Sequence, residues 1–333
     1  MNRVEWSTAR NRSKTLLIVE GKDEKEGLLS HLLEAFPEVN IDFQNIITYE
    51  TNIYALIRKI KKEYGEDWDQ EDIDLPFLIS NRKSDCPKMR KRDFTDIFLI
   101  FDYERHDVFF SETNIARMQK YFSQSEDVGK LYINYPMVES YLDLYSIPDK
   151  SYEYRKCSAN MKKGDEYKQA TSKTFIKCLI SLPDKIQKYL VGQGIDKATC
   201  DTIVYKIKSC NTLDDIDSLL SKFQQGNNLK KSTCYLNHLI SQFSFIKDGL
   251  SYNKYMRWIF QQIILHNIRK ANKIQKGIYD FSPEEMGNCF KNIDLNEILR
   301  RQNILSDPAG KAEINVLNTS VFLIPDYNLN IIF

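Results

Sequence analysis

Several patterns that define common classes of protein are missing from this 333-residue sequence. No apolar run approaches the roughly 20 residues needed to cross a bilayer, and residues 1–14 are polar and basic. We therefore expect neither a transmembrane segment nor a secretory signal. The seven cysteines form no CxxC pair, and the four histidines form no HxxxH or HExxH pattern. A disulfide framework and a zinc site are thus not expected, and we predict a cytoplasmic protein with reduced thiols.

An excess of one charge sign is also missing, since 47 Lys and Arg face 46 Asp and Glu. The charges are nevertheless gathered in blocks. Residues 63–74 hold seven acids and no base, residues 82–92 hold six bases and one acid, and residues 254–276 hold six bases and no acid. The 18 Phe and 19 Tyr residues exclude a disordered chain. A folded protein with locally polarised surfaces is therefore expected.

The first part of the chain alternates short apolar runs with segments of helical periodicity. Strands are predicted at 16–19, 43–49, 97–101 and 131–133. Helices are predicted at 23–36, 53–64, 115–122 and 137–145, whereas 65–95, with its short apolar piece 77–79, reads as irregular. This order predicts an α/β domain over residues 1–148, a Rossmann-like parallel sheet with helices on both faces.

The pattern changes after residue 148. A mainly α-helical accessory domain is predicted over 149–310, with helices at 174–182, 184–191, 197–210, 214–223, 235–245 and 252–276. The final segment, 311–333, contains a β-like run at 314–324 that we expect to rejoin the sheet or add an edge strand.

Acidic residues follow two of the predicted strands. Glu20 follows the first strand, and Asp102 ends the third, with Glu104 two residues later. Ligands of open parallel sheets bind beyond the carboxyl ends of the strands, and clustered carboxylates repel one another unless a cation is present. Mg²⁺ prefers such oxygen ligands. The plainer alternative is that these acids are turn residues, or, for Glu24, an acid favoured by a helix dipole.

Taken together, these strings resemble the TOPRIM domain of topoisomerases, primases and OLD-family nucleases, over roughly residues 14–147. Glu20 stands on the family's glutamate, and Asp102 and Glu104 stand on its DxD motif, with Glu in place of the second Asp. The resemblance implies Mg²⁺-dependent phosphodiester cleavage, with Mn²⁺ able to substitute. Its implied catalytic residues are Glu20, Lys22, Asp102 and Glu104, and its implied metal ligands are Glu20, Glu24, Asp102, Glu104, Asp107 and Glu139.

A second string, residues 129–141 (GKLYINYPMVESY), resembles the single-TOPRIM nuclease subunits of PARIS-type anti-phage systems. This resemblance implies a toxic endonuclease effector of abortive infection, restrained or triggered by an ABC-type ATPase partner. It favours RNA, tRNA in particular, slightly over DNA as substrate. Two alternatives stay open. One is a non-catalytic TOPRIM-like subunit that binds a partner ATPase or a nucleic acid; the other, less favoured for want of a zinc cluster, is a primase- or topoisomerase-type enzyme.

The basic blocks are candidate nucleic-acid contacts, because Lys and Arg neutralise phosphates. The candidates are Arg82, Lys83, Arg90, Lys91 and Arg92, which precede the Asp102 strand and are expected to flank the site, and Arg257, Arg269, Lys270 and Lys273, which share a predicted helix with Tyr255 and Trp258. The alternative for each block is a solvated face. The helical domain is available either for homodimerisation or for docking the ATPase, and no heptad run specifies which.

Overall fold

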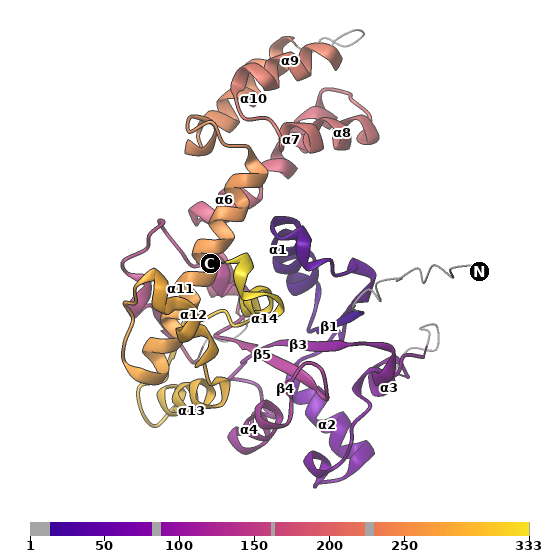
Figure 1. The fold of residues 1–333 in the computed structure, drawn as a ribbon, viewed down its shortest axis with the longest axis vertical. Helices are drawn as coiled ribbons and strands as arrows, with labels where there is room; N and C mark the ends of the chain where they lie inside the picture. Colours follow the sequence, from indigo (N-terminus) through magenta and orange to yellow (C-terminus); the bar gives the residue numbers. More distant parts are fainter. Residues whose placement is uncertain (1–13, 82–87, 161–163, 224–229, 333) are drawn as a thin grey trace, which may run out of the picture.

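The fold combines a five-stranded sheet with a helical region that extends away from it (Figure 1). A computed structural model describes residues 14–81, 88–160, 164–223 and 230–332. The predicted α/β class is confirmed by the mostly parallel sheet and its flanking helices. Within the described ranges, no helix has both the length and the apolar character needed to cross a membrane.

The sheet has the strand order β2-β1-β3-β5-β4. The strands are β1 (Thr15–Val19), β2 (Ile46–Thr48), β3 (Asp96–Asp102), β4 (Ser123–Gln124) and β5 (Gly129–Asn134). The pairs β1–β2, β1–β3 and β3–β5 are parallel, and the short edge strand β4 is antiparallel to β5. All five residues of β1 are buried, because helices cover both faces of the sheet.

The helices that connect these strands lie on opposite faces. They are a π-helical turn (Asp23–Leu29) that continues into α1 (Ser30–Ala35), then α2 (Ile53–Tyr64), α3 (Leu75–Ser80) and α4 (Glu112–Tyr121). The chain leaves β1 toward β2 in one direction and returns across β1 to β3 in the other. In line with the general rule that such crossovers are right-handed, α1 covers one face of the sheet, and α2 and α4 cover the other (Figure 1). The sheet therefore has a topological switch point between β1 and β3.

The rest of the chain is mainly helical, as predicted. The helices are α5 (Asp165–Thr171), α6 (Phe175–Ile180), α7 (Leu182–Gly192), α8 (Lys197–Ile207), α9 (Leu213–Phe223), α10 (Lys230–Ser241), α11 (Tyr252–Lys276), α12 (Pro283–Lys291), α13 (Leu295–Ser306) and α14 (Leu323–Tyr327). The 25-residue helix α11 runs from the outer helices α7 to α10 down to the sheet region, where it contacts α1 (Figure 1). Helix α13 packs against both α11 and α4.

Short 3-10 helices account for some differences from the predicted elements. They are Pro37–Val39, Phe43–Asn45, Trp68–Gln70, Lys91–Asp93, Val138–Leu142, Tyr152–Tyr154, Ser244–Ile246, Ser320–Phe322 and Leu329–Ile331. Only the last part of the predicted strand 43–49 is extended, since Asp42 caps a helical turn by accepting a hydrogen bond from the Gln44 N–H. The apolar piece 77–79 lies in α3, which Asp74 caps in the same way.

The structure of the β-like run 314–324 agrees only in part with the prediction. Strand β7 (Glu313–Asn315) pairs antiparallel with β6 (Lys156–Ser158) in a separate two-stranded sheet, and residues from Ser320 onward are helical. The segment between them docks on the carboxyl end of β5. Leu317 forms an isolated bridge with Tyr135, and the Thr319 hydroxyl donates to the Ile133 carbonyl at 2.9 Å. The segment thus meets the main sheet without adding a strand to it.

Candidate active site

The predicted acidic residues of β1 and β3 meet at the switch point. Glu20 follows the last residue of β1, and Asp102 is the last residue of β3, its neighbour in the sheet. The Asp102 N–H donates to Glu20 Oε2 at 3.2 Å, so the two residues are in contact. Asp102 is 7% exposed, and its Oδ1 is buried with no hydrogen-bond partner. The sequence prediction that these acids share one edge of the sheet is therefore confirmed.

Glu24 joins this pair from the start of the π-helical turn. Its carboxylate is buried, and its Oε2 accepts a hydrogen bond from the Gly21 N–H at 2.8 Å. The turn that carries Glu24 is a π-helix. Such turns are rare overall, but where they occur they are often found at functional sites. Glu24 therefore faces the site rather than solvent, as the metal-ligand prediction requires.

Glu139 approaches the same acids from the 3-10 helix Val138–Leu142. Its Oε2 is buried without a hydrogen-bond partner, and its Oε1 lies 3.2 Å from the Lys168 ammonium. Lys168, on α5, also pairs with Asp23 at 2.5 Å. Lys168 was not predicted as a site residue, because α5 lies in a different part of the chain from the acidic motifs and only the fold brings it to Glu139.

The carboxylates perturb one another. Burial, followed by the charges of Glu104 and Glu24, raises the pKa of Glu20 to about 8. Burial also raises the pKa of Glu24 to about 7, with Glu139 adding to the effect. Burial and then Glu24 and Glu20 raise the pKa of Asp102 well above its usual range. The site therefore resists holding several negative charges at once, and a cation would relieve that repulsion.

Glu104 and Asp107 are held together slightly apart from this group. The Asn52 amide donates to Glu104 Oε2 at 2.9 Å and to Asp107 Oδ2 at 2.7 Å. Asn52 also caps α2 by accepting a hydrogen bond from the Ala55 N–H, so this amide ties the loop after β3 to a helix. Glu104 has a positive φ of 35°, a strained backbone for a residue other than glycine. Its charge still acts on Glu20 and Asp102, whereas Lys22 is exposed at the rim.

The donor set fits Mg²⁺ in its chemistry. Buried carboxylate oxygens without partners on Asp102 and Glu139, and mutual repulsion among the acids, are what a hard cation would satisfy. The carboxylates are not, however, preassembled as a coordination sphere: within the described ranges, no three His, Cys, Asp or Glu side chains are arranged to hold a metal ion. Glu24 is turned to the Gly21 N–H and Glu139 to Lys168, so binding requires these side chains to turn.

The basic block before β3 does not flank these acids, contrary to our expectation. Arg90, Lys91 and Arg92 precede the amino end of β3, and Asp102 lies at its other end, about 20 Å away at the rise of a strand. Lys91 pairs there with Asp72 and Asp127. Part of the acidic block thus neutralises part of the basic block. Arg82 and Lys83 lie outside the described residues.

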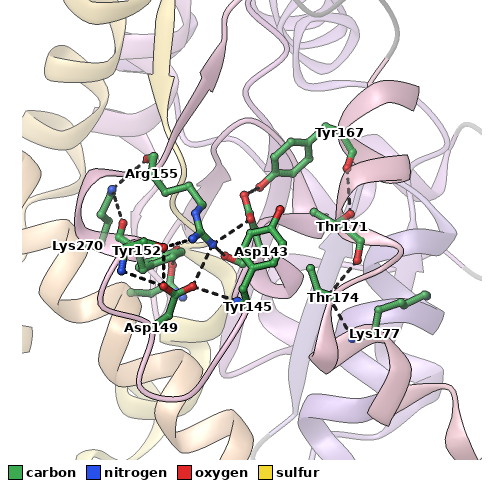
Figure 2. Close-up of polar contacts among 12 residues, drawn as sticks. Asp143, Tyr145, Asp149, Tyr152, Arg155, Tyr167, Thr171, Thr174, Lys177 and Lys270 are labelled. Carbon is green, nitrogen blue, oxygen red and sulfur yellow. Dashed lines mark hydrogen bonds and ion pairs between the residues drawn. The ribbon is translucent and has the colours of Figure 1, made fainter.

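The bases of α11 also have structural contacts. Lys270 is fully buried and donates to the carbonyls of Tyr152, Glu153 and Arg155 at 2.7, 2.7 and 3.0 Å (Figure 2). Burial, and then the nearby Lys273 and Arg155 charges, lower its pKa to about 7. Lys270 therefore cannot contact a nucleic-acid backbone, and that prediction is wrong.

The other predicted contacts on α11 differ in their surroundings. Arg257 pairs with Glu38 and donates to the Ala35 carbonyl at 3.2 Å, which ties α11 to the end of α1. Lys273 pairs with Glu153. Arg269 is partly buried, and its Nε has no hydrogen-bond partner. A nucleic-acid role for these three residues stays a prediction.

Comparison with known proteins adds no relative. No family model, no curated protein and no solved structure matches this chain. The resemblance to TOPRIM domains therefore rests on the residues themselves and on the α/β sheet that positions them.

Proposed function

We propose that the protein is a Mg²⁺-dependent endonuclease with a TOPRIM-like α/β domain. One observation carries this proposal: four acids from three segments of the chain, Glu20 and Glu24, Asp102, and Glu139, meet at the switch point of the sheet, where burial and mutual repulsion raise their pKa values. Perturbed carboxylates at the ligand edge of an α/β sheet are typical of functional sites. Holding these like charges together lowers the stability of the fold, a loss that a purely structural cluster would avoid.

The proposal gives the residues distinct tasks. Asp102, Glu20, Glu24 and Glu139 would hold the ion, which would supply positive charge for an attacking water and for the leaving oxygen of a phosphodiester. Glu20, with its pKa raised to about 8, holds a proton at neutral pH, and a bound cation would favour its ionised form. Lys22 is exposed two residues later and meets a substrate phosphate. Asn52 holds Glu104 in its strained conformation beside Glu20.

A cleavage assay with purified protein tests the proposal. The protein is incubated with tRNA, other RNA and DNA, with Mg²⁺ or Mn²⁺ and with a chelator in parallel. We expect metal-dependent cleavage, reduced roughly a hundredfold or more by Glu20→Gln or Asp102→Asn. The matched control is Glu26→Gln, which neutralises an exposed acid on the same π-helical turn. Cleavage that survives both site variants contradicts the assignment.

The resemblance to PARIS-type subunits extends the proposal to the cell. There the protein acts as a toxic effector of anti-phage defence, restrained by an ABC-type ATPase. Expression alone in a bacterium should arrest growth and fragment RNA or DNA, and Glu20→Ala should remove both effects. Co-expression with an ATPase encoded beside it should restore growth. Equal toxicity of the wild type and the Glu20→Ala variant would remove the nuclease from this role.

A second candidate function is supported by the absence, within the described ranges, of a ready three-ligand metal site. The Lys168 ammonium group already pairs with Glu139 and Asp23, so it supplies part of the positive charge that a metal ion would provide. A non-catalytic subunit that binds a partner or a nucleic acid is consistent with that arrangement. Calorimetric titration with Mg²⁺ separates the two candidates, since this second candidate predicts neither metal binding at the site nor cleavage of any substrate.

A further inference from the structure

A pocket of about 480 Å³ opens to solvent beside the small β6–β7 sheet. It is formed by the carboxyl half of α11, the end of α13, the loop that follows α13, the β6–β7 sheet and the 3-10 helix Tyr152–Tyr154. Its volume falls within the roughly 300–1,000 Å³ typical of small-molecule sites. None of the proposed metal ligands lines it, so it is a separate feature of the molecule.

The lining of the pocket is strongly basic. Five bases line it, against the single acid Glu153: Lys156, Lys270, Lys273, Arg301 and Lys311. Three of these bases pair with carboxylates, because Lys156 contacts Glu313, Lys273 contacts Glu153 and Arg301 contacts Glu297. Counting all three of those acids and leaving out Lys270, whose pKa burial lowers to about 7, the bases still exceed the acids by four to three. The pocket therefore favours an anion.

The bases differ in what they can offer a ligand. Lys270 already donates to three carbonyls, and burial lowers its pKa to about 7, so it offers a ligand neither a free hydrogen bond nor a full positive charge. Arg301 and Lys311 are exposed. The Arg301–Glu297 ion pair is exposed to solvent too, and such pairs contribute little free energy. An arriving phosphate can replace Glu297 as the partner of Arg301 and receive two parallel hydrogen bonds from its guanidinium.

Apolar side chains line the pocket beside these bases. Ile274 follows Lys273 on α11, and Ile304 and Leu305 lie about one turn beyond Arg301 on α13. Inorganic phosphate alone would leave these apolar side chains in water. A ligand that carries both phosphate groups and a flat, weakly polar ring matches a lining made of bases and apolar side chains.

We propose that this pocket binds a free nucleotide, with its phosphates against Arg301, Lys311, Lys156 and Lys273 and its base against Ile274, Ile304 and Leu305. This site is independent of the proposed nuclease, because its residues and those of the acidic site do not overlap. Its test therefore needs neither a divalent metal nor a cleavable substrate.

Isothermal titration calorimetry of the full-length protein, in a chelator at fixed ionic strength, tests the proposal. The probes are the four common ribonucleoside triphosphates, adenosine, inorganic phosphate and a 5′-phosphorylated oligonucleotide. We expect saturable binding of at least one triphosphate with a Kd below roughly 1 mM. Adenosine should bind at least about tenfold more weakly than ATP, because it lacks the groups that the bases recognise.

Two neighbouring arginines provide a matched pair of variants. Arg300 and Arg301 both pair with Glu297 and are both exposed, but only Arg301 lines the pocket. Arg301→Ala combined with Lys311→Ala should weaken triphosphate binding about tenfold or more, and Arg300→Ala should leave it within about twofold. Thermal melting of each variant verifies that it is folded.

Three results would overturn the proposal: no binding of any triphosphate, equal binding of adenosine and ATP, or equal weakening by the Arg300 and Arg301 variants. Binding of the oligonucleotide without binding of any mononucleotide would also overturn it, in favour of a nucleic-acid surface. Competition of inorganic phosphate with the bound triphosphate would support it.

Discussion

The acidic site and the Arg155 network are both clusters of buried ionisable groups, and they differ in how their charge is balanced. In the acidic site, Asp102 Oδ1 and Glu139 Oε2 have no hydrogen-bond partner. In the network of Figure 2, Arg155 lies 3.2 Å from Asp143 Oδ1 and 3.0 Å from Asp149 Oδ2. Asp143 also accepts a hydrogen bond from the Tyr167 hydroxyl at 2.8 Å. One cluster gathers like charges, and the other pairs opposite ones.

The difference separates groups that serve the fold from groups available to a ligand. The Arg155 network ties the segment after β5 to α5, and Lys270 joins the same segment to α11 (Figure 2). In a balanced buried network of this kind the charged groups already have partners, so none remains to bind a ligand. The acidic site is unbalanced, so free energy is released there only when positive charge enters.

The largest expected effect comes from breaking the balanced network. Arg155→Met would leave Asp143 and Asp149 buried without their cation, and we expect the free energy of unfolding to fall by about 3–5 kcal/mol. Urea denaturation followed by circular dichroism measures this change. Arg300→Met, an exposed arginine in a surface pair, serves as control and should change stability by less than about 1 kcal/mol. Similar losses in both variants would show that the network is not the source of stability.

A smaller effect is expected from the acidic site as pH changes. Burial raises the pKa of Glu20 to about 8 and of Glu24 to about 7, above the value of 4.5 expected when unfolded. The folded protein therefore binds more protons between about pH 5 and pH 8, so the stability contributed by these groups is complete below 4.5 and is lost as pH rises through 7 to 8. Without divalent cations, we expect the free energy of unfolding to fall on the order of 2 kcal/mol from about pH 5 to about pH 9.

Two additions make this pH experiment specific to the site. Glu20→Gln removes one titrating group and should flatten the pH dependence, whereas Glu26→Gln should not. Added Mg²⁺ should raise the melting temperature most at high pH, where the carboxylates are ionised. A melting temperature that does not change with pH in the wild type would contradict the raised pKa values.

The smallest effect concerns Lys168, which supplies positive charge to Asp23 and Glu139. Its side chain is 42% exposed, so Lys168→Met should lower the free energy of unfolding by only about 0.5–1 kcal/mol in the absence of metal. It should also enlarge the Mg²⁺-induced rise in melting temperature, because it removes a competing cation. Lys173→Met, an exposed lysine that follows α5, is the control. Equal Mg²⁺ responses in the two variants would remove Lys168 from the site.

Local patterns in the sequence predicted the sheet and part of the site. The apolar runs that became β1, β3 and β5 are buried on both faces, so they are recognisable without any alternation. The predicted helix 53–64 matches α2 from Ile53 to Tyr64. Because parallel strands end at the same edge of a sheet, Glu20 and Asp102 could be placed together from their positions alone.

Tertiary contacts decided what the sequence could not show. Arg90 to Arg92 lie close to Asp102 along the chain, which suggested that they flank the site. In the structure they precede the amino end of β3, whereas Asp102 lies at its carboxyl end. Lys270 looked like a surface base, yet three carbonyls from a distant segment hold it inside. The run 314–324 has β-like residues, but its side chains and backbone dock on the end of β5, and most of it is not extended.

The docking of residues 317–320 has a consequence for how the protein is made. The Thr319 and Ser320 hydroxyls donate to the Ile133 carbonyl and to the buried Asn134 side chain across a separation of 186 residues. These polar groups at the end of β5 are paired only after the segment has left the ribosome. A nascent chain, or a fragment ending at residue 148, therefore carries a strand β5 whose carboxyl end lacks these two partners. The sheet that positions the acidic residues is completed late in synthesis.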